Sequence, residues 1–297
     1  MSTMVENGKV SEPVNLTGSL TTSLVGSVAD FPVGRSLVTF KKEDGSVQEW
    51  PERNVIYRAD NCKELAVVSD RYSLVSNNQC FELIESAIQG AGIQDVRAGV
   101  AILSGGRKFR ALYILPESTY EIGPNDVLCC TILVTGSYDG STRLIMEVGA
   151  YRFACTNLMT GGGGILGGGF RVLHKGNLEK EIEQVTPMVE EILTTFPERA
   201  ARLAEWNEIP WGHDAYGFVM STLEDDHPGM KRHAKILGER WDGKPEDSNS
   251  LWWAYNEGTN YSTHETKSVG VAYRVGDAIN RSFLSYYGAL APADNLN

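Results

Sequence analysis

The chain has 297 residues, of which 42% are hydrophobic and 22% charged, and this composition is typical of a folded globular protein. Its 27 Lys and Arg residues are outnumbered by 38 Asp and Glu residues, and the net charge of -11 excludes a protein that coats nucleic acid through bulk charge. No apolar run approaches the ~20 residues of a membrane span, so we expect a cytoplasmic protein with no membrane partner.

Hydropathy and charge divide the chain into three regions. Residues 1–30 are rich in small and polar side chains, which predicts a flexible N-terminal arm. Residues 31–175 carry short runs typical of strands and one helical pattern, which predicts an α+β core domain. Residues 176–297 change to helical spacing and hold 11 basic and 20 acidic side chains, against 16 and 18 before them, so we expect an acidic, mainly helical domain.

The core domain begins with two hairpin patterns. The strand-like runs Ser36–Lys41 and Val47–Trp50 flank a turn with Asp-Gly at its tip, a strong hairpin signal. The runs Leu65–Ser69 and Tyr72–Ser76, which flank Asp70-Arg71, predict a second hairpin.

A helix and four more strands are expected next. The helix begins at a cap, Asn77 or Asn78, carries apolar residues at a spacing of three and four, and ends at Gly90 to Gly92. The predicted strands are Val100–Leu103, Phe109–Leu115, Val127–Thr135 and Arg143–Val148, the last after a turn at Tyr138-Asp139-Gly140-Ser141.

The C-terminal region has the pattern of a series of helices. A helical face runs from Leu178 to Phe196, with Pro187 expected to kink or interrupt it. The further predicted helices are Glu198–Trp206, Asp214–Leu223, Met230–Trp241, Leu251–Tyr261 and Val269–Leu290. The aromatic cluster Trp252-Trp253-Ala254-Tyr255 is expected to pack in the helical core.

A glycine tract follows Thr160, with seven glycines in nine residues. It lacks the Lys-Ser/Thr of a phosphate loop and the spacing of a dinucleotide fingerprint. Two interpretations stay open: a flexible loop between domains, or a cradle of backbone amides that binds phosphate. The cradle candidates are Gly161, Gly162, Gly163 and Gly164, and the cations Arg171 and Lys175 lie just beyond them.

A basic segment lies at the start of one predicted strand, where Arg107, Lys108, Phe109 and Arg110 follow a glycine turn. Strand alternation places Arg107 and Phe109 on one face and Lys108 and Arg110 on the other. Guanidinium groups on phosphates, with Phe109 stacked on a base, would suit a single-strand binder. A solvated turn with a core phenylalanine is the alternative.

Four arginines, Arg58, Arg71, Arg143 and Arg152, lie in or beside apolar strands. Ion pairs with Asp60, Asp70 or Glu147 are the ordinary explanation, and the alternative is that the arginines together line a groove. We include Arg152 among the candidate phosphate contacts.

Signals of catalysis are weak. The five histidines are scattered, and His227 and His233 do not have the spacing of ligands on one helix. The five cysteines lack CxxC spacing, which indicates reduced thiols rather than a zinc site or disulfides. No catalytic motif is present, so we expect a protein that is not an enzyme and that holds no metal or cofactor.

Four motifs together resemble a known family. They are Val67–Asn77, Gly136–Ser141, Tyr151–Asn157 and Leu251–Asn256, and in order and spacing they are similar to the phage/plasmid-like proteins catalogued as domain of unknown function 932. The resemblance implies a protein carried by phages or mobile elements in the bacterial cytoplasm, and it implies no established activity.

A looser resemblance bears on function. The pattern around Asp70-Arg71-Tyr72, ahead of an acidic helical region, is similar to the single-strand annealing recombinases of phages. It implies a homo-oligomer that binds single-stranded DNA and promotes annealing and recombination. The alternative is a protein-binding factor, such as a host-defence inhibitor or a virion-associated protein, that acts through the acidic helical half.

Overall fold

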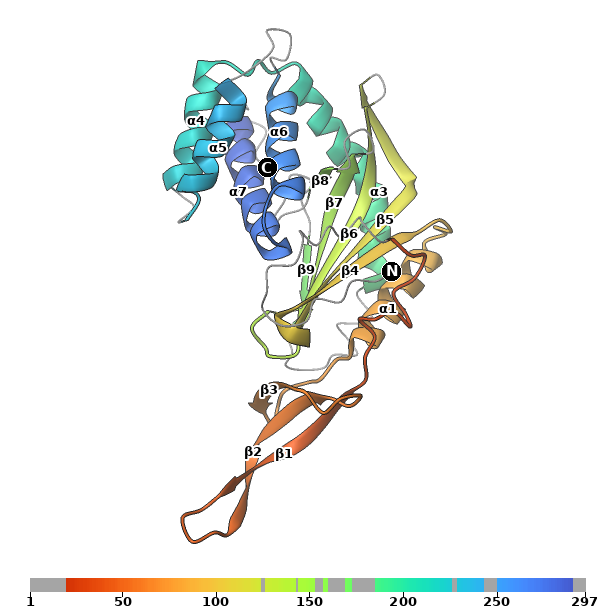
Figure 1. The fold of residues 1–297 in the computed structure, drawn as a ribbon. Coiled ribbons are helices and arrows are strands. Elements are labelled where there is room, and N and C mark those ends of the chain that lie inside the picture. Colours follow the sequence, from red (N-terminus) through yellow and green to blue (C-terminus); the bar gives the residue numbers. More distant parts are fainter. Residues whose placement is uncertain are drawn as a thin grey trace.

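The computed structural model describes residues 20–123, 126–142, 144–152, 157–159, 169–172, 185–225, 229–242 and 250–290. Within these residues the chain forms two antiparallel sheets followed by a mainly helical region, which confirms the predicted α+β class. Figure 1 shows the smaller sheet extending away from one end of the molecule, while the C-terminal helices after residue 212 gather toward the other end.

The smaller sheet contains β1 (Val33–Lys41), β2 (Val47–Arg58) and β3 (Glu64–Ser69), hydrogen-bonded in that order. The first predicted hairpin is therefore confirmed. The second is wrong, because β3 pairs with β2 and Tyr72–Ser76 is not a strand. The Arg35 guanidinium instead donates to the backbone carbonyls of Ser69, Asp70 and Tyr72, and these bonds hold the chain as it leaves the sheet.

The larger sheet carries the main core. Its path runs through β4 (Arg97–Leu103), β5 (Lys108–Gly123), β6 (Asp126–Ser137) and β7 (Leu144–Arg152), and both β8 (Asn157–Met159) and β9 (Gly169–Val172) pair with β7. All of these pairs are antiparallel. The strands expected from the sequence are confirmed, and β5 is longer than its apolar run suggested.

Helix α1 (Asn77–Gly90) covers one face of this sheet. Its cap is Ser76 rather than the expected asparagine, because the Ser76 hydroxyl accepts the Gln79 N–H while the Gln79 side chain accepts the Ser76 N–H. Phe81 of α1 packs edge-on against Phe109 of β5, with ring centroids 5.4 Å apart. The face of α1 that the sequence predicted to be apolar is therefore the face that it buries.

Helix α3 (Val185–Ala204) lies beside α1 and also contacts β5. Pro187, which was expected to kink or interrupt this helical face, is the third residue of α3, a position in the first turn where proline is tolerated. The expected break between Phe196 and Glu198 is wrong, because α3 continues through Pro197. The predicted helical residues 178–184 lie outside the described chain.

The remaining helices match the sequence pattern closely. They are a short 3-10 turn η2 (Glu205–Asn207), α4 (His213–Asp225), α5 (Lys231–Asp242), α6 (Leu251–His264) and α7 (Val269–Leu290). Phe283 of α7 stacks on Trp211 at 5.5 Å and on Trp206 at 6.0 Å. One continuous cluster of buried side chains joins α1, the sheet and these helices.

The described end of the expected N-terminal arm packs against the core. Thr21 forms a backbone bridge with Ala98 of β4. Leu24 is buried, and its N–H donates to the Glu85 carboxylate over 2.7 Å. Residues 20–30 are therefore not a free arm, in contrast to the expectation, and residues 1–19 lie outside the described chain.

Candidate anion site between the sheet and helix α7

A cavity of about 480 Å³ lies between one end of the sheet, formed by the start of β5, the end of β6 and the start of β7, and the first turn of α7. This volume falls within the usual range for small-molecule sites, roughly 300–1,000 Å³. Its lining combines two cations, four hydroxyl side chains of Ser and Thr, one tyrosine and a few apolar residues. The polar side chains are Ser104, Lys108, Arg110, Thr135, Thr142, Ser268 and Tyr273.

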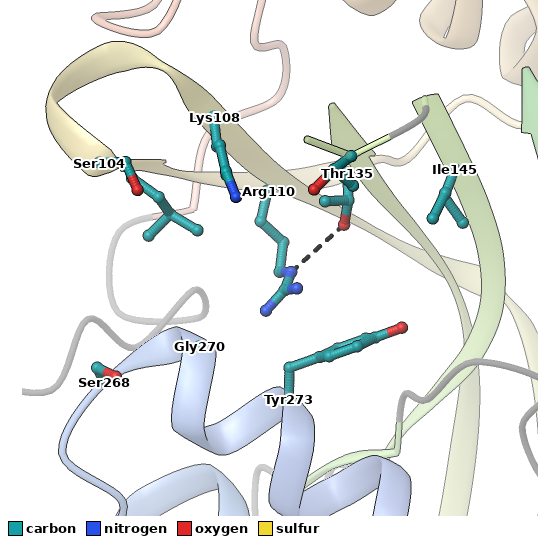
Figure 2. A pocket seen from close by; sticks show the side chains of 10 residues that line it. Ser104, Lys108, Arg110, Thr135, Ile145, Ser268, Gly270 and Tyr273 are labelled. Atoms are coloured by element: carbon teal, nitrogen blue, oxygen red, sulfur yellow. Dashed lines mark hydrogen bonds between the residues drawn. The ribbon is translucent and has the colours of Figure 1, made fainter. Parts of the chain in front are cut away.

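Arg110 lies at the centre of this lining and is only 9% exposed. Its Nε donates to the Thr135 hydroxyl over 3.3 Å, and its guanidinium carbon lies 4.1 Å from the centre of the Tyr273 ring (Figure 2). Burial lowers the pKa of Arg110, while Tyr273 and Glu147 act to raise it. An arginine stays protonated under such shifts, so a full positive charge is held here in a largely dry setting.

Glu147 on β7 is the negative counterpart of this group and is 4% exposed. The Tyr273 hydroxyl donates to its carboxylate, at 3.0 Å and 3.1 Å from the two oxygens. Burial, and then the neighbouring carboxylate, raise the pKa of Tyr273, so the phenol stays neutral and remains a donor. Tyr273 thus links a buried cation and a buried anion, and it joins α7 to the sheet.

The mouth of the cavity is a tight turn, η1 (Ser104–Gly106), in which all three residues have positive φ. The turn leads into Arg107, which is exposed, and Lys108, which is half-buried and lines the cavity. Asp139 lies near Lys108. Burial acts to raise the pKa of Asp139, but hydrogen bonds from Ser141 and Ser137 and the charge of Lys108 outweigh it, so the pKa is lowered. Of these two cations Lys108 lines the cavity, with one carboxylate nearby, whereas Arg107 is the exposed residue before it.

The first turn of α7 supplies the other wall. The backbone carbonyl of Ser268 accepts the N–H groups of Val271 and Ala272, so the helix starts beside the cavity. Both Ser268 and Gly270 line it. The positive end of the helix dipole therefore adds to the charges of Lys108 and Arg110, and the arrangement favours an anion with several hydrogen-bond acceptors, such as a phosphate.

The structure brings together only part of the predicted contact set. Lys108 and Arg110 share one face, as alternation predicted, whereas Arg107 precedes the strand. Phe109 points to the opposite face and is 3% exposed in the core, so its expected role in stacking on a base is wrong. Arg171 pairs with Ile145 through the backbones of β9 and β7, and Ile145 lines the cavity.

The other site residues predicted from the sequence fall outside the described chain. They are the glycines Gly161, Gly162, Gly163 and Gly164 and the cation Lys175. The structure describes neither a phosphate cradle nor a linker for the glycine tract.

Arg152 is held away from the cavity by a structural ion pair. Its guanidinium donates to Asp126, with Nη2 2.7 Å from Oδ2, and the Trp252 indole N–H donates to the same carboxylate over 2.9 Å. The role of Arg152 as a phosphate contact is therefore not supported. Its guanidinium group is already bonded to Asp126, and this contact links β7, β6 and α6. Arg58 is likewise paired with Asp60, as the ordinary explanation predicted.

The family-like motifs meet in pairs. The Tyr72 hydroxyl donates to the carbonyl of Ser137 over 3.0 Å, and the Tyr138 hydroxyl accepts the Asn77 N–H over 2.9 Å. These bonds join the first motif to the second. Arg152 and the Trp252 indole share the Asp126 carboxylate, and this joins the third motif to the fourth. These motif side chains therefore hold the fold together.

Metal binding and the ionisable side chains were candidates for chemistry elsewhere in the described chain. No group of three or more His, Cys, Asp or Glu side chains there could hold a metal ion. His233 contacts the Tyr261 hydroxyl at 2.7 Å, and burial raises the pKa of the Cys129 thiol to about 12. No described helix has the length and apolar character needed to cross a membrane.

Sequence reasoning missed Tyr273, Ser268 and the first turn of α7 as parts of the site. Glu147 was named only as a partner for a strand arginine. No local motif marks Tyr273 or Ser268, because these residues approach Arg110 only where α7, far along the chain, packs against the sheet.

Comparison with known proteins places the chain in a family. No solved structure matches it. A family model with the description Domain of unknown function (DUF932) matches residues 64–284, about three quarters of the chain, and this range includes the large sheet, the cavity and the helices but leaves out β1 and β2. The chain therefore belongs to the DUF932 family.

Proposed function

We propose that this protein binds single-stranded DNA and promotes strand annealing as a homo-oligomer of a phage or mobile element, with the cavity beside α7 holding a backbone phosphate. One observation carries the proposal: Lys108 and Arg110 face the same cavity, together with hydroxyl side chains and the start of a helix. Phosphate oxygens accept hydrogen bonds from all of these groups.

The charge distribution supports a local contact rather than a surface-wide one. The chain carries a net charge of -11, so most of its surface repels a polyanion. Lys108 lines the cavity, and exposed Arg107 is its neighbour in the sequence, so the two cations lie close together at this end of β5. A site of this kind binds one or two phosphates per subunit, and repeated subunits along the strand would add their contributions.

The test is fluorescence polarisation with a labelled oligothymidylate across a salt series. Arg107→Ala with Lys108→Ala removes two cations and should lower the salt slope by roughly 0.7 for each phosphate that is no longer neutralised. The matched control removes two adjacent exposed cations elsewhere, Lys231→Ala with Arg232→Ala on α5, and should leave the slope unchanged. Strand annealing is measured on the same proteins.

A competition experiment separates the cavity from a diffuse charge effect. At equal ionic strength, inorganic phosphate should displace the oligonucleotide more strongly than chloride does, because only phosphate matches the hydroxyl and guanidinium donors of the cavity. Equal competition by both anions, together with an unchanged salt slope in the Arg107 and Lys108 variant, would remove the cavity from the proposal.

A further inference from the structure

The outer part of the β1–β2 hairpin, residues 37–53, is here called the ribbon. It extends away from the rest of the molecule (Figure 1), and every residue from Val47 to Arg53 is exposed. Two strands without a packed face are marginally stable in water. Yet the ribbon carries large apolar side chains, including Phe40 at 45% exposed and Trp50 at 46%. Such exposure on a protruding element is typical of a docking surface.

One face of the ribbon is both apolar and basic. The register pairs Val38 with Trp50 and Phe40 with Gln48, so alternation places these side chains on the same side. Lys42 continues that alternation one residue beyond β1. The Arg53 guanidinium lies 5.6 Å from the centre of the Trp50 ring. This face therefore combines two aromatic rings with two cations.

The opposite face differs in character. It carries Glu49 paired with Thr39, and Val47 paired with Lys41. The Glu49 carboxylate is thus kept off the aromatic face.

A second exposed patch lies on the helices, at the other end of the molecule from the ribbon (Figure 1). Phe218 of α4 is 39% exposed, and its ring lies 5.5 Å from that of Tyr286 on α7. Asp214 and Asp225 precede and follow Phe218 by four and seven residues, so they flank it on the same side of α4. We call these four residues the helical patch, an apolar centre with an acidic rim.

We propose that the aromatic face of the ribbon docks on the helical patch of a second copy of this chain. The two surfaces match in chemistry, since aromatic rings meet aromatic rings while Lys42 and Arg53 meet Asp214 and Asp225. Because the ribbon and the patch lie at opposite ends, the contact is head-to-tail, and its repetition gives a ring or a filament. This inference does not rest on the proposed DNA binding.

Charge favours this occupant over a second ribbon. Ribbon against ribbon would bring the same cations together, and like charges across an interface oppose association. A nucleic acid strand is the alternative partner for the rings and the cations, and the experiment below separates it from a second copy of the chain.

The experiment uses two full-length variants, each disabled at one end. The ribbon variant carries Phe40→Ser and Trp50→Ser, and the patch variant carries Phe218→Ser and Asp214→Lys. All four positions are exposed, so both variants should fold, and the patch variant should melt only slightly below the wild type because Asp214→Lys places a cation in the first turn of α4. Val47→Ser, on the other face of the ribbon, is the matched control. Mass is measured by light scattering on a size-exclusion column over a concentration series without DNA.

The expected result is specific to a head-to-tail contact. The wild type and the control should form species larger than the 32.6 kDa chain, whereas each variant alone should remain a monomer. An equimolar mixture of the two variants should form a dimer of twice that mass, because one intact ribbon can meet one intact patch. Loss of the aromatic anchors should weaken association by at least about tenfold.

Three outcomes would overturn the inference. A monomeric wild type at all concentrations excludes the contact. A patch variant that still dimerises alone indicates ribbon-to-ribbon pairing. If the wild-type protein has the mass of one chain and the ribbon variant no longer binds the oligonucleotide, the aromatic rings of the ribbon contact DNA rather than a second copy. None of these outcomes decides whether the cavity binds phosphate, which is read from the salt slope of the Arg107 and Lys108 variant.

Discussion

Removing one hydroxyl group at Tyr273 tests the link between α7 and the sheet. Tyr273→Phe keeps the ring over the Arg110 guanidinium, 4.1 Å away, and deletes the donor that lies 3.0 Å and 3.1 Å from the two oxygens of Glu147. A hydrogen bond to a charged group contributes about 1.5–3 kcal/mol, and Glu147 is too deeply buried for water to replace it fully. We expect the free energy of unfolding to fall by about that amount.

The assay is thermal and urea denaturation at pH 7. At roughly 2 °C per kcal/mol for a chain of this size, the melting temperature should fall by about 3–6 °C. Tyr286→Phe is the matched control on the same helix, because its hydroxyl makes no hydrogen bond with any residue that the structure describes. The control should shift the melting temperature by less than about 1 °C.

The result that would refute the reasoning is equal stability of the two variants. It would mean that Glu147 does not depend on the Tyr273 hydroxyl, and the described position of α7 against β7 would then be wrong. A fall in stability without any change in oligonucleotide binding would be a different result, since it would confirm the structural contact and separate it from the proposed phosphate site.

Two further predictions concern packing and pH. Gly136→Ala would place a methyl group 2.5 Å from the Phe109 ring, so we expect a loss of about 1–3 kcal/mol in urea unfolding, whereas Gly123→Ala meets no atom within 4 Å and should have little effect. Stability should also fall as pH rises above about 9 to 10. Buried groups with raised pKa values stay protonated in the folded state at a pH where the same groups have ionised in the unfolded chain. Each such group lowers the free energy of unfolding by about 1.4 kcal/mol per pH unit. A pH-independent melting temperature between about pH 9 and 11 would contradict this. These groups include the thiols of Cys80 and Cys129, whose pKa values are both raised to about 12, and the phenols of Tyr72, Tyr113, Tyr138, Tyr255 and Tyr273.

Local patterns were sufficient to predict most elements. The bounds Val269–Leu290 of α7 follow from helical spacing alone, and the Asp-Gly turn was enough to identify the β1–β2 hairpin. Alternation along β5 also separated Lys108 and Arg110 from Phe109. These features depend on residues within a few positions of one another, and such interactions are readable in a sequence.

The errors share a cause, which is that distant residues decided the outcome. Tyr72–Ser76 has the pattern of a strand, but it does not pair in the sheet, and Arg35, far earlier in the chain, binds the carbonyls of Asp70 and Tyr72 at its start. A helix break was expected between Phe196 and Glu198, but α3 continues through Pro197. The choice between a base-stacking and a core role for Phe109 was settled by Phe81, which packs on it from α1.

Sequence alone determined the fold class, the family resemblance and the two cations at the start of β5. Only the tertiary structure decided that Arg110 faces Tyr273 and Glu147, that Arg152 forms an ion pair with Asp126, and that the ribbon is exposed on both faces. The physical reason is that burial and charge pairing depend on which distant segments meet. A strand pattern specifies two faces, and the elements packed against each face decide which becomes core and which lines a site.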